Sequence, residues 1–272
     1  MPENLNEIHP AIVFFIMVMR YVVIAGPAYL ILYILFKHRF SLQKIQTKFP
    51  EKWDYIREVT WSVFTLFIFT VIAYVMFHPY VLPHTLIYQD FNEYGFLYSI
   101  FSFVALVFFH DAYFYWTHRF MHHPKVFKIL HLVHHKSTNP SPWAAFAFHP
   151  LEAIIEAGVL IIASFIIPLH YYTMVVFIMF MTIYNVYGHL GYELYPKWIN
   201  KNFIGKWLNT SVNHNMHHKH FHGNYGLYFR FWDEWMGTTR KDYEKTFDDV
   251  TGKNVKESDL HQSDLSFPLI RK

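Results

Sequence analysis

Histidines at helical spacing dominate the chemistry that this chain could perform. The 272 residues include 20 histidines, most of them between His110 and His222. Residues three and four apart lie on one face of an α-helix and can direct their imidazoles to one point. Such faces predict a metal site with nitrogen ligands. Three groups have this spacing: His118-Arg-Phe-Met-His122, His131-Leu-Val-His134-His135 and His214-Asn-Met-His217-His218.

The number of imidazoles and the lack of cysteine narrow the kind of metal site. The chain contains no cysteine, which excludes disulfides, thiolate-held iron–sulfur clusters and a cysteine nucleophile. The eight histidines of the three groups exceed what one tetrahedral zinc ion uses. We therefore expect two metal ions, with one crowded site as the alternative. Imidazole binds iron, zinc and copper alike, so the ligand type does not choose the metal.

The elements that must position these histidines are membrane helices. The chain is 53% hydrophobic, 21% aromatic and only 16% charged. The apolar runs 11–36, 59–77 and 96–117 are long enough to cross a bilayer, and Gly26-Pro27 predicts a kink in the first. Residues 151–187 predict a hairpin that either spans or re-enters the membrane. The fold class is therefore all-α, a polytopic membrane protein with about four to five membrane helices.

The distribution of basic residues predicts the orientation. Lys and Arg are frequent in 37–58, in 118–150 and after His189, but are absent from 78–95. By the positive-inside rule, the basic segments face the cytoplasm. All three histidine groups lie in these segments, which predicts a cytoplasmic, histidine-rich helical cap that binds metal. The net charge of +3 is spread along the chain, which argues against nucleic-acid binding.

Three regions follow from this pattern. Residues 1–95 are expected to hold the N-terminal membrane helices, and residues 96–241 the histidine-box catalytic domain with the hairpin at 151–187. Residues 242–272 are polar and are expected to form a loosely held C-terminal tail.

The histidine groups and their neighbours together resemble a known family. The chain is similar to the fatty acid hydroxylase superfamily, also called the sterol desaturase family, over about residues 100–240. The resemblance is carried by His110-Asp-Ala-Tyr-Phe-Tyr-Trp-Thr-His118-Arg-Phe-Met-His122-His123, His131-Leu-Val-His134-His135-Lys136, Asn185-Val-Tyr-Gly-His189, Asn213-His214-Asn-Met-His217-His218, Asn224-Tyr-Gly and Phe231-Trp-Asp-Glu-Trp-Met-Gly237-Thr.

The resemblance implies an integral-membrane, non-haem di-iron oxygenase. It implies two iron ions, which zinc can replace on overexpression, and a further ligand at His189 after the hairpin. Some relatives have histidine at the position of Asn185, so that ligand is either missing here or replaced by water or the amide. The metal ligands implied are His118, His122, His131, His134, His135, His189, His214, His217 and His218.

Further polar residues close to the boxes are candidates to support the site. Asp111, Glu152 and Glu193 could orient metal-binding imidazoles through the other ring nitrogen, or serve only as interfacial or helix-end charges. His110 projects about 80° from His118 on one helix and could approach the centre. His149 begins the hairpin and could line the site.

The implied reaction is hydroxylation of an unactivated C–H bond of a lipid with O₂, or desaturation of the same bond. Fatty acyl chains, sterols and related lipids remain open as substrates. The chain has no G-x-G-x-x-G fingerprint, flavin fold or haem-binding domain. Electrons must therefore come from a separate donor, such as a cytochrome b5-like protein, a ferredoxin or a reductase.

Two other functions remain as alternatives. A zinc-dependent membrane hydrolase would need a general base beside the metal, but no HExxH motif is present. A non-catalytic metal transporter would favour polar residues at mid-membrane depth, whereas the histidine groups lie outside the spans. A haem-binding membrane protein would need one histidine on each of two facing spans. The sequence ends in Leu-Ile-Arg-Lys without a dilysine retrieval signal, which favours a bacterial inner membrane over the endoplasmic reticulum.

Overall fold

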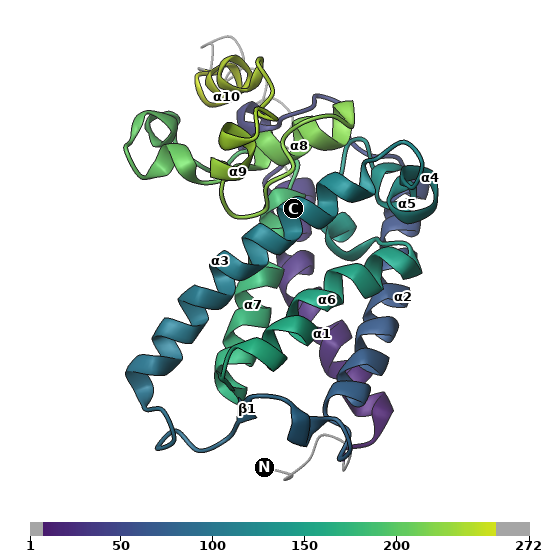
Figure 1. Cartoon of the computed structure of the whole chain (residues 1–272). Coiled ribbons are helices and arrows are strands. Elements are labelled where there is room, and N and C mark those ends of the chain that lie inside the picture. The colour runs from purple at the N-terminus through teal and green to yellow at the C-terminus, as the bar shows by residue number, and fades with distance from the viewer. Residues whose placement is uncertain (1–7, 254–272) are drawn as a thin grey trace, which may run out of the picture.

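Long apolar helices form the lower half of the molecule and short helices form the upper half (Figure 1). The computed structural model describes residues 8–253. The long helices are α1 (Pro10–Tyr29, continued by the π-helix η2, Leu30–Leu35), α2 (Lys52–Met76), α3 (Phe96–Met121), α6 (Pro150–Ile166) and α7 (Tyr171–Gly188).

The shorter elements connect these helices or build the upper half. The two strands pair in parallel, with Ile87 opposite Leu169 and Tyr88 opposite His170. The short elements are η3 (Ser41–Gln43), η4 (Leu82–His84), β1 (Ile87–Tyr88), α4 (Phe127–Leu130), α5 (Leu132–His135), η5 (Pro142–Phe146), β2 (Leu169–His170), η6 (Lys197–Lys201), η7 (Gly205–Trp207), α8 (Ser211–His220), α9 (Phe231–Trp235) and α10 (Tyr243–Thr251).

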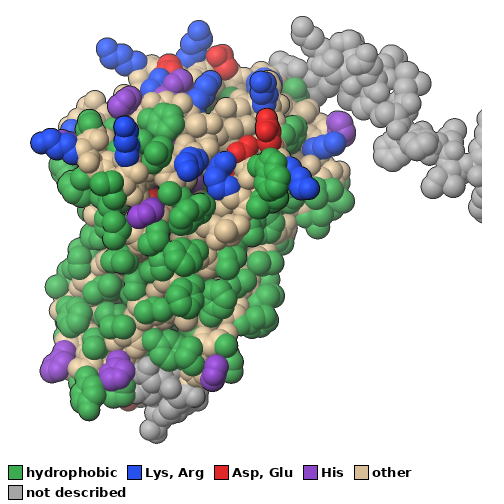
Figure 2. All heavy atoms as spheres, turned by 90° about the vertical axis from the view of Figure 1, so that its right-hand side faces the viewer, with side chains coloured by type: hydrophobic (Ala, Val, Ile, Leu, Met, Phe, Trp, Pro, Cys, Tyr) green, Lys and Arg blue, Asp and Glu red, His purple; other side chains and the backbone are tan. Residues whose placement is uncertain are grey.

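The helical membrane fold predicted from the sequence is confirmed. Among the described residues, four helices are long and apolar enough to cross a bilayer: Pro10–Leu35, Lys52–Met76, Phe96–Met121 and Tyr171–Gly188. Helix α6, with 17 residues, is slightly shorter, so whether it spans or re-enters stays a prediction. Hydrophobic side chains cover the lower body, whereas Lys and Arg gather at the upper end (Figure 2). The molecule therefore has one apolar, membrane-compatible body and one basic end.

Two helix boundaries differ from the sequence expectation for local reasons. Helix α1 continues through Pro27 and then widens into the π-helix Leu30–Leu35. A proline lacks the N–H that an α-helix needs, and a π turn accommodates such a defect. Helix α2 begins at Lys52 rather than at residue 59, because the carboxylate of Asp54 accepts a hydrogen bond from the Glu51 N–H at 2.9 Å and closes the first turn.

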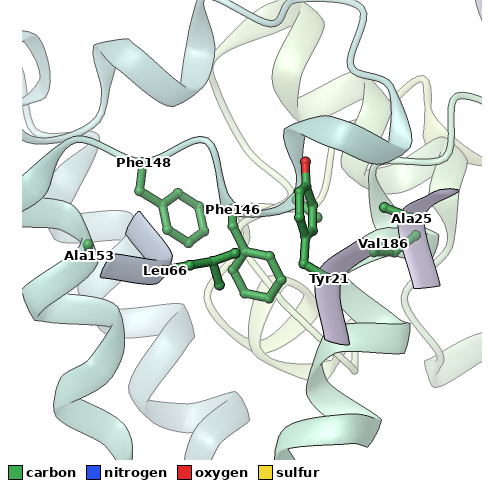
Figure 3. Close-up of a cluster of buried hydrophobic side chains, with 8 residues drawn as sticks. Tyr21, Ala25, Leu66, Phe146, Phe148, Ala153 and Val186 are labelled. Atoms are coloured by element: carbon green, nitrogen blue, oxygen red, sulfur yellow. The ribbon is translucent and has the colours of Figure 1, made fainter. Parts of the chain in front are cut away.

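A cluster of buried side chains attaches the upper half to the membrane helices (Figure 3). Phe146 and Phe148 follow the second histidine group in sequence and insert between Tyr21 of α1 and Leu66 of α2. The Tyr21 hydroxyl also donates a hydrogen bond to the carbonyl of Trp143 at 2.7 Å. The segment between α5 and α6 is thus held on top of the bundle, which places the second histidine group above α6.

The start of the expected C-terminal tail is an ordered helix. Tyr243 and Phe247 of α10 are fully buried, and they pack with Val250 against Val212 and Met216 of α8. The expectation of a loosely held segment from residue 242 is therefore wrong for α10, because its apolar side chains cover the outer face of the helix that carries the third histidine group. Residues 254–272 of the expected tail lie outside the described residues.

This packing predicts that Phe247→Ala destabilises the cap. Removing a buried phenylalanine ring costs about 3–5 kcal/mol, so thermal unfolding of the detergent-solubilised protein should shift clearly to lower temperature. Lys245→Ala on the exposed face of the same helix is the control and should change stability by less than about 0.5 kcal/mol. Equal effects of the two substitutions would contradict the packing described here.

Candidate metal centre

The C-terminal ends of α3 and α7 and the short helices α5 and α8 direct the predicted histidines into the interior of the cap. His118 lies in the last turn of α3, and His122 caps that helix. His131 precedes α5, which carries the rest of the second group, and α8 carries the whole third group. His189 follows the last residue of α7. All of them except His122 are buried, so the centre is closed to bulk water at these positions.

The nine predicted ligands form two clusters. In each cluster one ligand nitrogen per residue lies within 4.8 Å of all the others. This arrangement matches the two-ion prediction in number, while the binding of metal stays a prediction. The first, the five-histidine cluster, contains His118, His122, His131, His135 and His217, and the second, the four-histidine cluster, contains His134, His189, His214 and His218.

The spacing within each box explains how one helix serves both clusters. On an α-helix, residue i+4 projects about 40° to one side of residue i. Residue i+3 projects about 60° to the opposite side. His214 and His218 accordingly share the four-histidine cluster, while His217 faces the other one. The clusters also share a wall, since the rings of His135 and His218 stack with centroids 4.8 Å apart.

Backbone carbonyls determine which ring nitrogen carries the proton. The Nδ1 atoms of His118 and His217 lie 2.9 and 2.8 Å from the carbonyl oxygens of Tyr225 and Gly223. A carbonyl can only accept a hydrogen bond, so Nδ1 must donate and Nε2 must carry a lone pair. The same holds for His218 with the carbonyl of Ser137 at 3.0 Å, and for His189 with that of Asn185 at 2.7 Å.

The lone pairs of His189 and His218 face each other, an arrangement that a cation would stabilise. The Nε2 atoms of His189 and His218 are 3.1 Å apart, and both rings have their proton on Nδ1. His131 Nε2 is buried without a hydrogen-bond partner among the described residues. Two imidazoles bound to one metal at about 2.0–2.1 Å place their nitrogens roughly 3.0–3.3 Å apart. The donor set therefore fits a metal ion in each cluster.

Burial keeps these imidazoles in the neutral form that binds metal. Desolvation lowers the pKa of His189 to about 4, although its hydrogen bond to the Asn185 carbonyl opposes the shift. In the other rings outside the membrane helices, desolvation and repulsion between neighbouring imidazoles lower the pKa below its usual value. These rings are His122, His131, His134, His135, His214, His217 and His218.

Of the three predicted carboxylates, Glu152 contacts an imidazole. Its Oε1 lies 2.6 Å from His131 Nδ1, and both side chains are buried. A carboxylate in this position sets the tautomer and makes the imidazole a stronger ligand. Sequence position alone could not single out Glu152, because the contact depends on how the segment between α5 and α6 folds back.

Asp111 and Glu193 act on the backbone instead. Asp111 accepts hydrogen bonds from the N–H groups of Tyr228 and Phe229 at 2.7 and 3.1 Å. Glu193 accepts from the N–H of Val212 at 2.9 Å, in the first turn of α8, and burial raises the pKa of its carboxyl. An acceptor at this end satisfies an N–H that the helix leaves free. These carboxylates therefore hold the segments that present the ligands.

His110, His149 and Asn185 lie outside both clusters. His110 Nδ1 is 2.9 Å from the hydroxyl of Tyr228. His149 caps α6, and its Nδ1 accepts a hydrogen bond from the Leu151 N–H at 3.3 Å. Asn185 lies one turn before His189 of the four-histidine cluster, and its amide donates to the Ala145 carbonyl at 2.6 Å. The four-histidine cluster has one ligand fewer than the five-histidine cluster. It is also the cluster nearest Asn185, the position at which some relatives have histidine.

Sequence reasoning missed the carbonyl acceptors and the residues that shape them. Gly223 has a φ of +76°, and a Cβ atom there would lie 2.5 Å from the Thr238 carbonyl oxygen. Only glycine places this carbonyl against His217 without a clash. The Tyr225 ring lies 5.2 Å from the ring of His122 and closes the five-histidine cluster on one side. The Asn224-Tyr-Gly motif was the only sequence signal for this loop.

A family comparison places this geometry among known proteins. The model of the fatty acid hydroxylase family matches residues 102–238, which include all nine clustered histidines. The chain belongs to the fatty acid hydroxylase family. The matched region also agrees with the extent of the resemblance in the sequence, about residues 100–240.

Individual relatives of this fatty acid hydroxylase family member are fungal and mammalian. A Delta(7)-sterol 5(6)-desaturase of Gibberella zeae is 29% identical over 184 residues, which are 68% of this chain and 55% of the relative. Lathosterol oxidase of Homo sapiens is 30% identical over 184 residues, 67% of this chain and 60% of the relative. The chain thus spans a little over half the length of these relatives. No solved structure matches the chain.

A cavity inside the membrane helices approaches the metal centre of this family member. It has a volume of about 130 Å³ and is lined mainly by apolar side chains of α1, α2, α3, α6 and α7. Phe148 and Asn185 form part of its wall. The Phe148 ring lies 5.1 Å from the ring of His134, and the Asn185 carbonyl holds His189. The cavity therefore ends against the four-histidine cluster.

The Glu152–His131 contact predicts a specific effect on metal affinity. Glu152→Gln removes the negative charge that strengthens His131 as a ligand, so metal affinity should fall about 10- to 100-fold. Competition with a chelator measures the change in the solubilised protein. Glu93→Gln, at an exposed carboxylate in the loop before α3, is the matched control and should leave affinity unchanged. Unaltered affinity in Glu152→Gln would mean that the contact does not act on a metal.

Proposed function

We propose that this protein is a membrane-bound, non-haem di-iron oxygenase that oxidises an unactivated C–H bond of a lipid. The observation that carries the proposal is the pair of imidazole clusters whose Nε2 atoms face one another at 3.0–3.2 Å. Buried neutral imidazoles in this number suit two iron ions. Iron held there would supply the activation of O₂ that attack on an alkyl C–H bond requires.

The chain's own residues would bind the metals and exclude water. The five-histidine cluster would hold one ion and the four-histidine cluster the other, while Glu152 and the carbonyl acceptors keep the ring orientations. The smaller ligand set leaves more room for other ligands on the side of the cavity. Because the cavity opens among apolar helices, a lipid would enter from the bilayer rather than from water.

The names of the relatives bear on the outcome of the reaction. The sequence favours hydroxylation, whereas the relatives described above are named as a sterol desaturase and a lathosterol oxidase. Desaturation of a sterol-like lipid is therefore the second candidate outcome. Product analysis separates the two, since hydroxylation adds one oxygen atom to the lipid and desaturation removes two hydrogen atoms.

The electron donor would approach the basic end of the molecule. A surface pocket of about 490 Å³ is lined by His222, Tyr225, Arg240, Lys241 and their neighbours. Tyr225 also contacts the five-histidine cluster, so this pocket lies against that cluster. Arg240 pairs with Asp242 of the same wall, and Lys241 gives the pocket a net positive charge that would attract an acidic one-electron carrier.

The location follows in part from the same features. The four apolar helices make this a membrane protein. We propose that the basic end with the metal centre faces the cytoplasm, as the distribution of Lys and Arg predicts. The relatives described here are eukaryotic and give no support to the bacterial inner membrane that the sequence favoured.

The alternative functions fit the geometry less well. A hydrolase needs a free general base beside the metal. Glu152 is not free, because it contacts His131. In the described part of the chain, neither histidine cluster includes a carboxylate. A haem would require two opposed histidines with a flat space between them. Nε2 atoms 3.1 Å apart leave no such space.

Metal analysis tests the proposal first. Protein purified in mild detergent and reconstituted anaerobically with iron should retain about two iron ions per chain, because each cluster holds one. His134→Ala should lose iron from the four-histidine cluster, whereas His123→Ala, at an exposed histidine outside both clusters, should keep it. Elemental analysis gives the count. Protein that retains no iron after reconstitution, or one that oxidises no lipid with O₂ and a reductant, would overturn the proposed function.

The docking of the electron donor is tested by charge reversal. Arg240→Glu combined with Lys241→Glu should weaken binding of a plant-type ferredoxin, an acidic probe, about tenfold at low ionic strength. The difference should shrink as salt is added, because exposed charges are screened. Lys201→Glu, an exposed lysine outside the pocket, is the control. Equal binding by both variants would place the docking surface elsewhere.

A further inference from the structure

The apolar cavity among the membrane helices contains two charged side chains. Arg20 of α1 and Glu156 of α6 both line it, although most of the wall is hydrocarbon. We propose that Arg20 and Glu156 bind the hydroxyl group of a lipid substrate, and that they thereby determine which carbon of the lipid faces the metal centre. This proposal rests on the proposed function, because it concerns the substrate of the same site.

Arg20 is a charged residue without a charged partner inside a candidate membrane span. It lies in the middle of Pro10–Leu35, and its Nε atom is buried without a hydrogen-bond partner among the described residues. Its guanidinium lies 5.8 Å above the ring of Phe146. A charge within a membrane helix is costly and is normally retained for a function. Arg20 lies outside residues 102–238, so the family's histidine boxes do not explain it.

Glu156 offers the complementary half of the site. It lies one turn after Glu152 on α6 and, in the described part of the chain, forms neither an ion pair nor a hydrogen bond. Arg20 and Glu156 are therefore not paired with each other, although they face the same cavity. Both keep their hydrogen-bonding capacity for a third group.

The two side chains together select a hydroxyl group. A guanidinium only donates hydrogen bonds, a carboxyl oxygen accepts them, and a hydroxyl does both. A lipid carboxylate could pair with Arg20 but has no hydrogen to donate to Glu156. A pure hydrocarbon would leave both polar groups unsatisfied, which costs free energy in a dry cavity.

The positions along the helices indicate where the hydroxyl lies relative to the metals. On α7 the wall runs from Met174 in the first turn to Asn185 in the last, next to His189. Glu156 lies one turn after Glu152, which contacts His131, and Arg20 lies over the ring of Phe146, whereas Met76 and Phe77, at the end of α2, are apolar. The hydroxyl would thus be held close to the centre and the hydrocarbon would extend away. The oxidised C–H bond should lie within a few bonds of the hydroxyl-bearing carbon rather than in mid-chain.

Binding to the metal-free protein tests the proposal independently of turnover. The probes are two matched pairs, 5α-cholestan-3β-ol with 5α-cholestane and octadecan-1-ol with octadecane. The wild type should bind the alcohol of at least one pair about tenfold or more tightly than the hydrocarbon. Arg20→Met and Glu156→Met should each remove most of this preference while hydrocarbon binding stays the same.

The control and the contrary outcomes are as follows. Met17→Leu changes an apolar side chain of the same cavity wall, one turn before Arg20, and should keep the preference. Equal binding of alcohol and hydrocarbon in both pairs, or a preference that survives both substitutions, would overturn the proposal. A preserved preference in a protein that binds no iron and oxidises no lipid would instead reject the proposed function and leave this binding site standing.

Discussion

The rest of the structure depends on one constraint, the forced alignment of imidazole lone pairs. Carbonyl groups from Tyr225, Gly223, Ser137 and Asn185 fix the proton of four rings on Nδ1, and Nε2 atoms meet at about 3.1 Å in the interior. Without a cation this arrangement is repulsive, so the protein must hold it by packing elsewhere. Three buried carboxylates hold the backbone in this arrangement. Glu193 accepts a hydrogen bond from a backbone N–H in the first turn of α8, which carries the third histidine group. Asp111 and Asp233 accept hydrogen bonds from backbone N–H groups of the segment 225–228, which includes the Tyr225 carbonyl.

The membrane bundle and the cap divide the remaining tasks. The bundle provides a dry cavity and a fixed platform, to which Phe146 and Phe148 attach the segment that follows the second histidine group. The cap provides the ligands and the basic outer surface (Figure 2). Neutral imidazoles tolerate this dry interior because their pKa values are lowered by burial, whereas a charged ligand set would resist desolvation. The lack of cysteine and the excess of histidine in the composition are therefore suited to a metal site at a membrane surface.

Local periodicity was sufficient to predict the helices and the eight histidines of the three groups, which the structure brings together with His189 in two clusters, because both depend on short-range spacing. It was not sufficient for the partners of those residues. A carbonyl such as that of Gly223 has no side-chain signature, and the contact of Glu152 with His131 depends on a long fold-back. Arg20 interrupts the apolar run 11–36, and its role cannot be read from that position, since the cavity that it shares with Glu156 exists only after the helices pack. Helix α10, in contrast, carried a readable signal: Tyr243, Phe247 and Val250 are spaced as one apolar face.

The division of each HxxHH box between the two clusters would couple the binding of one metal ion to the binding of the other. Helix α8 gives His217 to one cluster and His214 and His218 to the other, and α5 divides its histidines in the same way. Binding of a first ion would order α5 and α8, and the ligands of the second ion would then already be in place. The second ion would therefore bind with a smaller loss of conformational entropy. Such a centre would fill with positive cooperativity, so that the half-loaded state would be sparsely populated. Two-electron chemistry would then be confined to fully assembled sites, which limits the release of partly reduced oxygen.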